Sequence, residues 1–323
     1  MSRRTKVMLI LGAVIMAAGF VVCIVGAIIS NANGDQLFAA KTEEGKGYSY
    51  TFSGEDINKI EIEATDATVN IIGGATESKI ELINFNENFY SFNCSNRLIT
   101  FKESPDLSSV LRFWESGFTF KGMRYVLRLD RVNGPKTINI YLTNKDYVKN
   151  FTISVGKGKI TAEDLTTESD YNFALTDGAV TMTNVKTESV ISIAAATSSD
   201  LDIVMNEVSA KTLNINAAYA ELKSEALSFG GGKLNITHGS AQIDFIPKSE
   251  FFKLNVNANG KLTVNEESFI STFAFDKLPD TSAAPDGDGE TTEPEFSTIT
   301  IDGRELAVFL TGDCFASVTS PEE

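Results

Sequence analysis

The chain carries an internal repeat of short apolar alternations whose starts lie 20 to 22 residues apart. Each unit opens with an apolar–polar–apolar triplet, and alternation with period two is typical of a strand that buries one face. One such unit cannot bury its apolar face alone, so neighbouring units must stack to make a continuous core. The triplets begin at Phe151, Tyr171, Ile191, Leu213, Leu234 and Leu254.

A second apolar position follows each triplet after a turn rich in Gly, Asn, Asp or Ser, so each unit holds two short strands. We therefore expect an all-β protein whose repeats of roughly 20 residues stack in register as a β-solenoid, similar to a parallel β-helix. An antiparallel meander or sandwich is the alternative, because Asp177-Gly178 and Asn259-Gly260 are also good hairpin turns. The second apolar positions are Ile160, Val180, Leu201, Leu222, Ile243 and Leu262.

The middle residue of every triplet is small and polar. Stacking in register would place these residues in one ladder on the outer face, where such side chains stabilise stacked strands. The same ladder is our candidate binding face, with Asn172, Asn214, Asn235 and Asn255 as its asparagines. The alternative is that Asn and Thr are simply common on the wet face of strands.

Residues 7–29 contain no charged side chain and are long enough to span a bilayer. Arg3, Arg4 and Lys6 precede them, and the next basic residue is Lys41. The positive-inside rule then predicts a single-pass signal anchor with a cytoplasmic N-terminus and an extracytoplasmic C-terminal domain. A cleaved signal peptide is the alternative, although the apolar run is too long for one.

The composition divides the chain into successive segments. We expect a cytoplasmic stub (1–6), the transmembrane anchor (7–29), a stalk (30–50), the strand-repeat domain (51–275), an acidic Pro/Gly linker (276–296) and C-terminal strands with a tail (297–323). Two strands, 297–301 and 306–310, are expected to return and cap the far end of the stack, because open sheet edges need protection.

A stretch within the repeat domain, 85–130, breaks the period and is rich in aromatic residues. Its second half supplies a candidate contact site for a membrane protein or for lipid headgroups, since aromatic side chains anchor interfaces. The alternative is a hydrophobic plug over the membrane-proximal end of the stack. The candidate contact residues are Phe113, Trp114, Phe118 and Phe120.

No pattern for catalysis, a cofactor or a metal stands out. His238 is the one histidine, which disfavours a catalytic triad or a zinc site. Residues 286–290 resemble a calcium loop but lack the EF-hand spacing. Cys94 and Cys314 are the two exported cysteines, and a bridge between opposite ends of a rigid stack would be too long.

The chain carries a net charge of −15, and because the stub contributes +3, the remainder carries −18. Such a charge disfavours nucleic acids and anionic lipid as partners.

The runs Ile138-Asn139-Ile140-Tyr141-Leu142 and Phe151 to Leu165 resemble the central motif of a family of bacterial β-strand-repeat proteins provisionally named adhesins. Gly156-Lys157-Gly158 and Asp177-Gly178 match the turns of that family, whereas Thr143 stands where it usually has proline. The resemblance covers roughly 57–275. It implies a bacterial envelope protein with a β-solenoid-like domain, often membrane-anchored, and it carries no catalytic residues.

The sequence thus favours a non-enzymatic, membrane-anchored envelope protein whose β-solenoid serves adhesion or binding, with an envelope polymer or another membrane protein as partner. A second hypothesis is an accessory or sensor subunit of an envelope-stress system, acting through the membrane helix and the aromatic insertion. A glycan-active enzyme ranks last, because acids do not recur in a column along the repeat.

Overall fold

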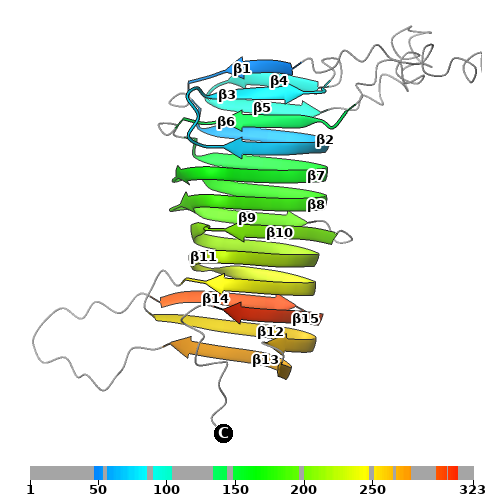
Figure 1. Ribbon diagram of the computed structural model, residues 1–323, viewed down its shortest axis with the longest axis vertical. Helices are drawn as coiled ribbons and strands as arrows, with labels where there is room; N and C mark the ends of the chain where they lie inside the picture. Colours follow the sequence, from blue (N-terminus) through cyan, green and yellow to red (C-terminus); the bar gives the residue numbers. More distant parts are fainter. Residues whose placement is uncertain are drawn as a thin grey trace, which may run out of the picture. The chain divides into compact units, whose positions relative to one another are not determined.

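The computed structural model describes residues 47–53, 57–85, 90–103, 134–143, 148–195, 200–246, 251–264, 267–277, 296–303 and 305–311. These residues form fifteen strands and no helix, so the expectation of an all-β protein is confirmed (Figure 1). In this part of the chain, no helix is long and apolar enough to cross a bilayer. The predicted anchor, 7–29, lies outside these ranges.

The central strands pair in parallel and in register. Ile60 of β2, Phe151 of β7, Tyr171 of β8, Ile191 of β9 and Leu213 of β11 are successive Cα partners. The predicted in-register stacking is therefore confirmed from Phe151 to Leu213, and Ile60 of β2 continues it. The strands of this region are β2 (Lys59–Ile72), β7 (Asn150–Thr167), β8 (Asp170–Thr187), β9 (Val190–Ala195), β10 (Asp200–Asn206) and β11 (Ser209–Phe245).

The core runs through the inside of this stack, because the first residues of β2, β7, β8 and β9 alternate between inward and outward positions. All five aligned residues from Ile60 to Leu213 are fully buried. The rings of Phe151 and Tyr171 stack at 5.1 Å between centroids, with 2° between their planes. The Tyr171 hydroxyl is hydrogen-bonded to Thr167 Oγ1 at 2.9 Å, and burial raises the pKa of Tyr171 to about 12.

The turns expected inside each repeat are corners, not hairpins. β7 and β8 each continue through such a corner, and the two strands remain parallel on both sides of it. Gly158 and Gly178 stand at the corners with φ of 140° and 135°, which glycine adopts without strain. We call each turn of the chain around the stack a rung. A Cβ on Gly178 would lie 1.8 Å from the carbonyl oxygen of Gly158, so only glycine allows this close approach between rungs.

The N-terminal end of the stack differs from the prediction. β1 (Gly47–Thr51) begins inside the segment expected to be a stalk, and it pairs antiparallel with β3 (Lys79–Ile83), which pairs with β6 (Thr137–Tyr141). The expected insertion contains β4 (Tyr90–Ser95) and β5 (Leu98–Glu103). Because β5 lies parallel beside β2, this part of the insertion belongs to the sheet.

The repeat within β11 is shorter than predicted. We expected Leu234 above Leu213, but Gly232 lies there instead, with φ of 150° and a Cβ position 1.9 Å from the Leu213 carbonyl oxygen. Only glycine can occupy this place, so the rung closes over 19 residues and Leu234 shifts to the position above Ile215. The physical cause is the glycine run 230–232, which permits a tighter corner.

The two C-terminal strands exist as predicted but do not cap the far end. β14 (Phe296–Gly303) and β15 (Glu305–Thr311) lie between β11 and β12 (Phe251–Val264), and they are parallel to both. Figure 1 shows them, in orange-red and red, between yellow and gold rungs. β13 (Glu267–Lys277) instead pairs antiparallel with β12 on its other side. An inserted strand forms hydrogen bonds along both edges, whereas a cap forms them along one.

Replacing Gly178 by Ala should lower the free energy of unfolding by roughly 2–4 kcal/mol, because the Cβ meets the Gly158 backbone and the corner needs a positive φ. Chemical denaturation followed by circular dichroism measures the loss. Gly47→Ala is the matched control, since its Cβ would lie 3.9 Å from the Leu82 carbonyl oxygen. Equal effects of the two variants would contradict the tight corner.

Candidate binding face

Four small polar residues occupy the same position on four successive rungs. Thr152 of β7 is the Cα partner of Asn172, Asn172 of Ser192, and Ser192 of Asn214. All four are half-buried, between fully buried neighbours in the strand. Adjacent strands lie about 4.8 Å apart, so these side chains follow one another along the stack at that spacing. We call them the polar column.

The four predicted asparagines do not all lie in this ladder. Asn172 and Asn214 belong to the polar column, but the Asn214 Oδ1 accepts a hydrogen bond from the backbone N–H of Lys233 at 3.3 Å. Asn235 donates from Nδ2 to the Asn216 Oδ1 at 2.8 Å, which places it one column away. The 19-residue rung of β11 causes this shift.

Asn255 returns to the line of the polar column. It is the Cα partner of Thr300 in β14, and Thr300 is the partner of Lys233 in β11. Two residues that the prediction did not include, Lys233 and Thr300, therefore stand between Asn214 and Asn255. The inserted strand β14 is the reason, and a sequence repeat cannot reveal it.

A second column beside the polar column carries very small side chains. Ser154, Ala174 and Ala194 are successive Cα partners two residues beyond the polar column, and all three are exposed. Asn216 continues the line on β11. Because these side chains are short, the face is flat beside the polar column, so a partner can approach the strands closely. These small residues were visible in the sequence, since each follows the middle residue of its triplet by two positions.

Charged pairs border this neutral region along the stack. On the β2 side, Lys59 contacts Glu61 at 2.5 Å and Lys102 contacts Glu63 at 2.7 Å. On the β14 side, Lys233 contacts Asp302 at 2.7 Å. Exposed pairs of this kind contribute little to stability. The four residues of the polar column are uncharged, and Asp170, two residues before Asn172 on β8, is the charged residue beside them on the central rungs.

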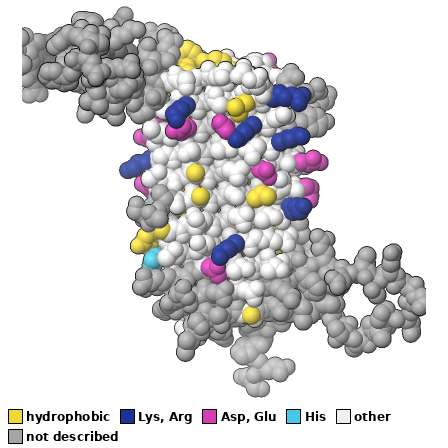
Figure 2. Space-filling model, turned by 180° about the vertical axis from the view of Figure 1, so that it is seen from behind, with side chains coloured by type: hydrophobic (Ala, Val, Ile, Leu, Met, Phe, Trp, Pro, Cys, Tyr) yellow, Lys and Arg dark blue, Asp and Glu magenta, His cyan; other side chains and the backbone are white. Residues whose placement is uncertain are grey.

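His238, the one histidine of the chain, is part of an aromatic pair. Its ring stacks on Tyr219 at 4.8 Å with 14° between the planes, and Tyr219 is 43% exposed. The Nδ1 of His238 is buried and makes no hydrogen bond. Figure 2 shows the histidine beside a hydrophobic patch, on a face where charges of both signs are otherwise scattered.

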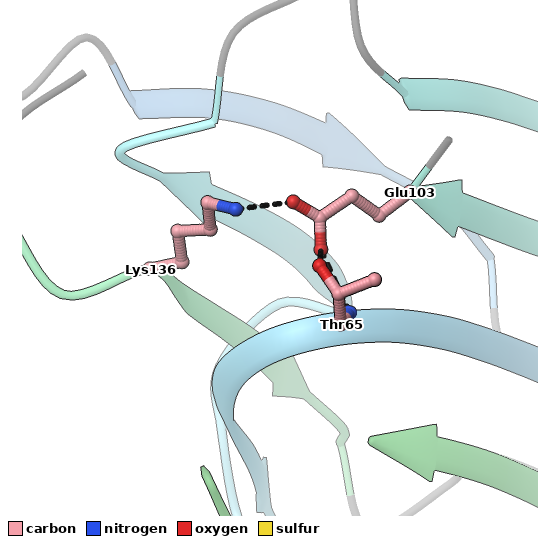
Figure 3. Close-up of polar contacts among 3 residues, drawn as sticks. All are labelled: Thr65, Glu103 and Lys136. Carbon is pink, nitrogen blue, oxygen red and sulfur yellow. Dashed lines mark hydrogen bonds and ion pairs between the residues drawn. The ribbon is translucent and has the colours of Figure 1, made fainter. Parts of the chain in front are cut away.

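Among the ion pairs of the described residues, the most buried belongs to a cluster that the sequence did not reveal. Glu103, at the end of β5, accepts hydrogen bonds from the backbone N–H of Thr65 at 2.8 Å and from its hydroxyl at 2.7 Å, and it pairs with Lys136 (Figure 3). Burial raises the pKa of Glu103, but the hydrogen bonds from Lys136 and Thr65 outweigh it and hold the pKa below its usual value. The cluster ties β2, β5 and the start of β6 together, which is a structural role.

Aromatic side chains next to this cluster pack into the core. Phe85 and Phe101 are buried, with their ring centroids 5.0 Å apart, and Tyr90 lies 5.3 Å from Phe101. This first half of the aromatic stretch therefore belongs to the core. The candidate contact residues of its second half, Phe113, Trp114, Phe118 and Phe120, lie outside the described residues, as does Cys314.

Other features of the described ranges suggest no chemical centre. They contain no group of three potential metal ligands, and Cys94 is exposed and unpaired. A small cavity beside Phe151, Leu165 and Ser169 has a volume of about 20 Å³, which suits about one water molecule. The flat face of the polar column is therefore the best candidate site that this part of the chain offers.

Replacing Glu103 by Gln should lower the free energy of unfolding at pH 7 by about 2 kcal/mol, because charge-assisted hydrogen bonds are lost. Since the folded-state pKa of Glu103 lies below its ordinary value of 4.5, this contribution is complete above pH 4.5 and disappears as the pH falls through the folded-state value. Denaturation at pH 7 and at about pH 3 should therefore show a smaller difference between wild type and variant at the lower pH.

Glu63→Gln is the control for this measurement. The pair that Glu63 forms with Lys102 is more than half exposed, so its loss should cost no more than about 0.5 kcal/mol. A Glu103→Gln effect as small as this, or one independent of pH, would contradict the structural role of the cluster.

The chain is similar to several proteins of known structure. A protein of Clostridium sporogenes, provisionally named a cell adhesion protein, is 13% identical over 84% of this chain and 100% of its own, with a TM-score of 0.32. A provisionally named adhesin of Bacteroides fragilis is 10% identical over 83% of this chain and 97% of its own, with a TM-score of 0.43.

A protein of Parabacteroides distasonis, provisionally named a lipid-binding protein, is 10% identical over 82% of this chain and 97% of its own, with a TM-score of 0.34. No curated protein matches this chain. The family model described as Toastrack DUF4097 matches residues 57–272, which is more than half of the chain, so the protein belongs to the Toastrack DUF4097 family.

Proposed function

We propose that this chain is a non-enzymatic binding protein of the bacterial cell envelope, and that its strand stack is a β-solenoid that presents the polar column to an envelope polymer. One observation carries the proposal: Thr152, Asn172, Ser192 and Asn214 repeat the same kind of side chain along four rungs. An extended polymer that lies along the stack would meet similar hydroxyl and amide groups at every rung.

Anchoring in the membrane belongs to the same proposal. Residues 7–29 are apolar and uncharged, and the basic residues Arg3, Arg4 and Lys6 precede them. This distribution supports a single-pass anchor with the strand stack outside the cell. There it would face the polymers of the envelope.

The charge of the chain supports an uncharged ligand. A protein with a net charge of −15 is repelled by anionic polymers. The residues of the polar column are neutral, so no charged side chain of the column has to lose its hydration when an uncharged ligand binds. Hydroxyl and amide groups both donate and accept hydrogen bonds, as sugar hydroxyl and acetamido groups do. We therefore assign the polar column to a neutral glycan chain.

The double variant Asn172→Ala/Asn214→Ala should bind insoluble chitin, a neutral polymer of N-acetylglucosamine, roughly tenfold more weakly than wild type. Two lost hydrogen bonds at about 0.7 kcal/mol each account for a change of this size. The measurement is co-sedimentation of the full-length, detergent-solubilised protein with increasing amounts of chitin.

The matched control is Thr181→Ala/Thr183→Ala. These two half-buried residues lie on β8 beyond the corner at Gly178, on another face of the same rung. They should leave binding unchanged, and circular dichroism should show that both variants are folded. If the asparagine variant sediments as wild type does, the polar column is structural and the proposed binding role fails.

A further inference from the structure

Two aromatic rings on successive rungs of β11 are stacked on each other at a corner of the chain. The ring centroids of Tyr219 and His238 are 4.8 Å apart, with 14° between the two planes. A Cβ on Gly239, at this corner, would meet the backbone of Ala220, so Tyr219 and His238 hold equivalent positions one rung apart. We call these two side chains the ring pair. Because each ring packs on the other, both keep a fixed orientation before any ligand binds.

The ring pair is accessible from solvent. Tyr219 is one of two large apolar side chains that are exposed in the described ranges. Ala218 and Ala220 flank it in the chain, and Gly239 follows His238, so the neighbouring side chains are small. The histidine and the hydrophobic patch beside it are visible at the surface in Figure 2. An exposed aromatic surface of fixed orientation is typical of an interaction site.

The ring pair adjoins the face that we assign to a neutral glycan. Asn214 of the polar column, then Asn216 and then Tyr219 follow one another along β11, and this distance is at most about 17 Å. On the next rung, Asn235 is hydrogen-bonded to Asn216 and is followed three residues later by His238. Amide side chains therefore lead from the polar column toward the two rings.

The surroundings of the ring pair suit a ligand that is uncharged and rich in hydroxyl groups. β11 contains no Asp, Glu, Lys or Arg in 212–220 or in 234–243. On the adjoining strands, the Cα partners of the two rings are acidic residues, Asp200 and Glu305. Carboxylate groups repel anions and accept hydrogen bonds from hydroxyl groups.

An aromatic ring and the apolar face of a sugar ring have complementary charge distributions. The aromatic face carries partial negative charge, and the axial C–H groups of a pyranose present partial positive charge to it. We propose that the ring pair is a stacking subsite for one sugar residue of the glycan that the polar column binds. Tyr219 supplies the exposed ring and His238 positions it. This inference rests on the proposed function, because it takes the same neutral glycan as the ligand.

The variant Tyr219→Ala should bind chitin roughly fivefold more weakly than wild type in the co-sedimentation measurement, because the stacking surface is lost. Tyr219→Phe should bind as wild type does, since stacking requires the ring and not its hydroxyl group. Ile246→Ala is the matched control. Ile246 is the other exposed large apolar side chain of the described ranges and lies just beyond the end of β11, so its loss should leave binding unchanged.

His238 provides a direct readout of the subsite. It is the one histidine of the chain, so its imidazole gives a single set of NMR signals in full-length, detergent-solubilised protein that carries labelled histidine and no histidine tag. The probe is chitotetraose, whose ring substituents are all equatorial, so that both faces of each ring are apolar. Chitotetraose should shift the His238 signals in wild type and leave them in place in Tyr219→Ala.

The possible outcomes separate the subsite from the proposed function. Failure of wild type to bind chitin would overturn both. Chitin binding that depends on Asn172 and Asn214 but is unchanged in Tyr219→Ala would overturn the subsite alone, as would His238 signals that chitotetraose does not shift. Weaker binding by Tyr219→Phe would assign the effect to the hydroxyl group and overturn the stacking. A shift with the cationic, unacetylated tetramer of glucosamine and none with chitotetraose would identify a cation site instead.

Discussion

The structure depends on parallel backbone pairing in register between rungs of nearly equal length. This pairing places residues of equal position directly above one another, so each position becomes a column through the stack. Inward columns must then fill a common interior, as Ala162, Met182, Met205 and Ser224 do in one such line. The same register aligns the outward positions. Where successive rungs carry similar side chains there, these form lines along the stack, as the polar column and the small residues beside it do.

Close approach at the corners is the second requirement of this arrangement. Rungs lie one strand spacing apart even where the chain bends, and a side chain at a corner can block that approach. Gly158, Gly178, Gly232 and Gly239 each lie where a Cβ would come within 2.0 Å of the backbone carbonyl of the preceding rung. In β11, Gly232 thus sets the length of the rung, and through it the register of the residues that follow.

The sequence predicted the features that depend on local alternation and missed those that depend on distant partners. The rungs at Phe151, Tyr171, Ile191 and Leu213 were predictable because each repeats an apolar triplet at an even spacing. The 19-residue rung of β11 was not, because Gly232 acts through the carbonyl of Leu213 on another rung. β14 and β15 were correctly predicted as strands. Their alternation could not indicate their place, because the same pattern is compatible with the end of a stack and with its middle. Glu103 and Lys136 are 33 residues apart in the chain and share no local pattern.

The columns also affect how binding energy would be distributed on such a face. Compact interfaces concentrate their energy in a few buried aromatic or arginine side chains. The polar column offers instead several equivalent groups of modest individual strength, each on its own rung. Some of the neighbouring amides are already used within the stack, as Asn216 is by Asn235. An extended ligand must therefore contact several rungs at once, so the length of the ligand, more than any single residue, would set its affinity.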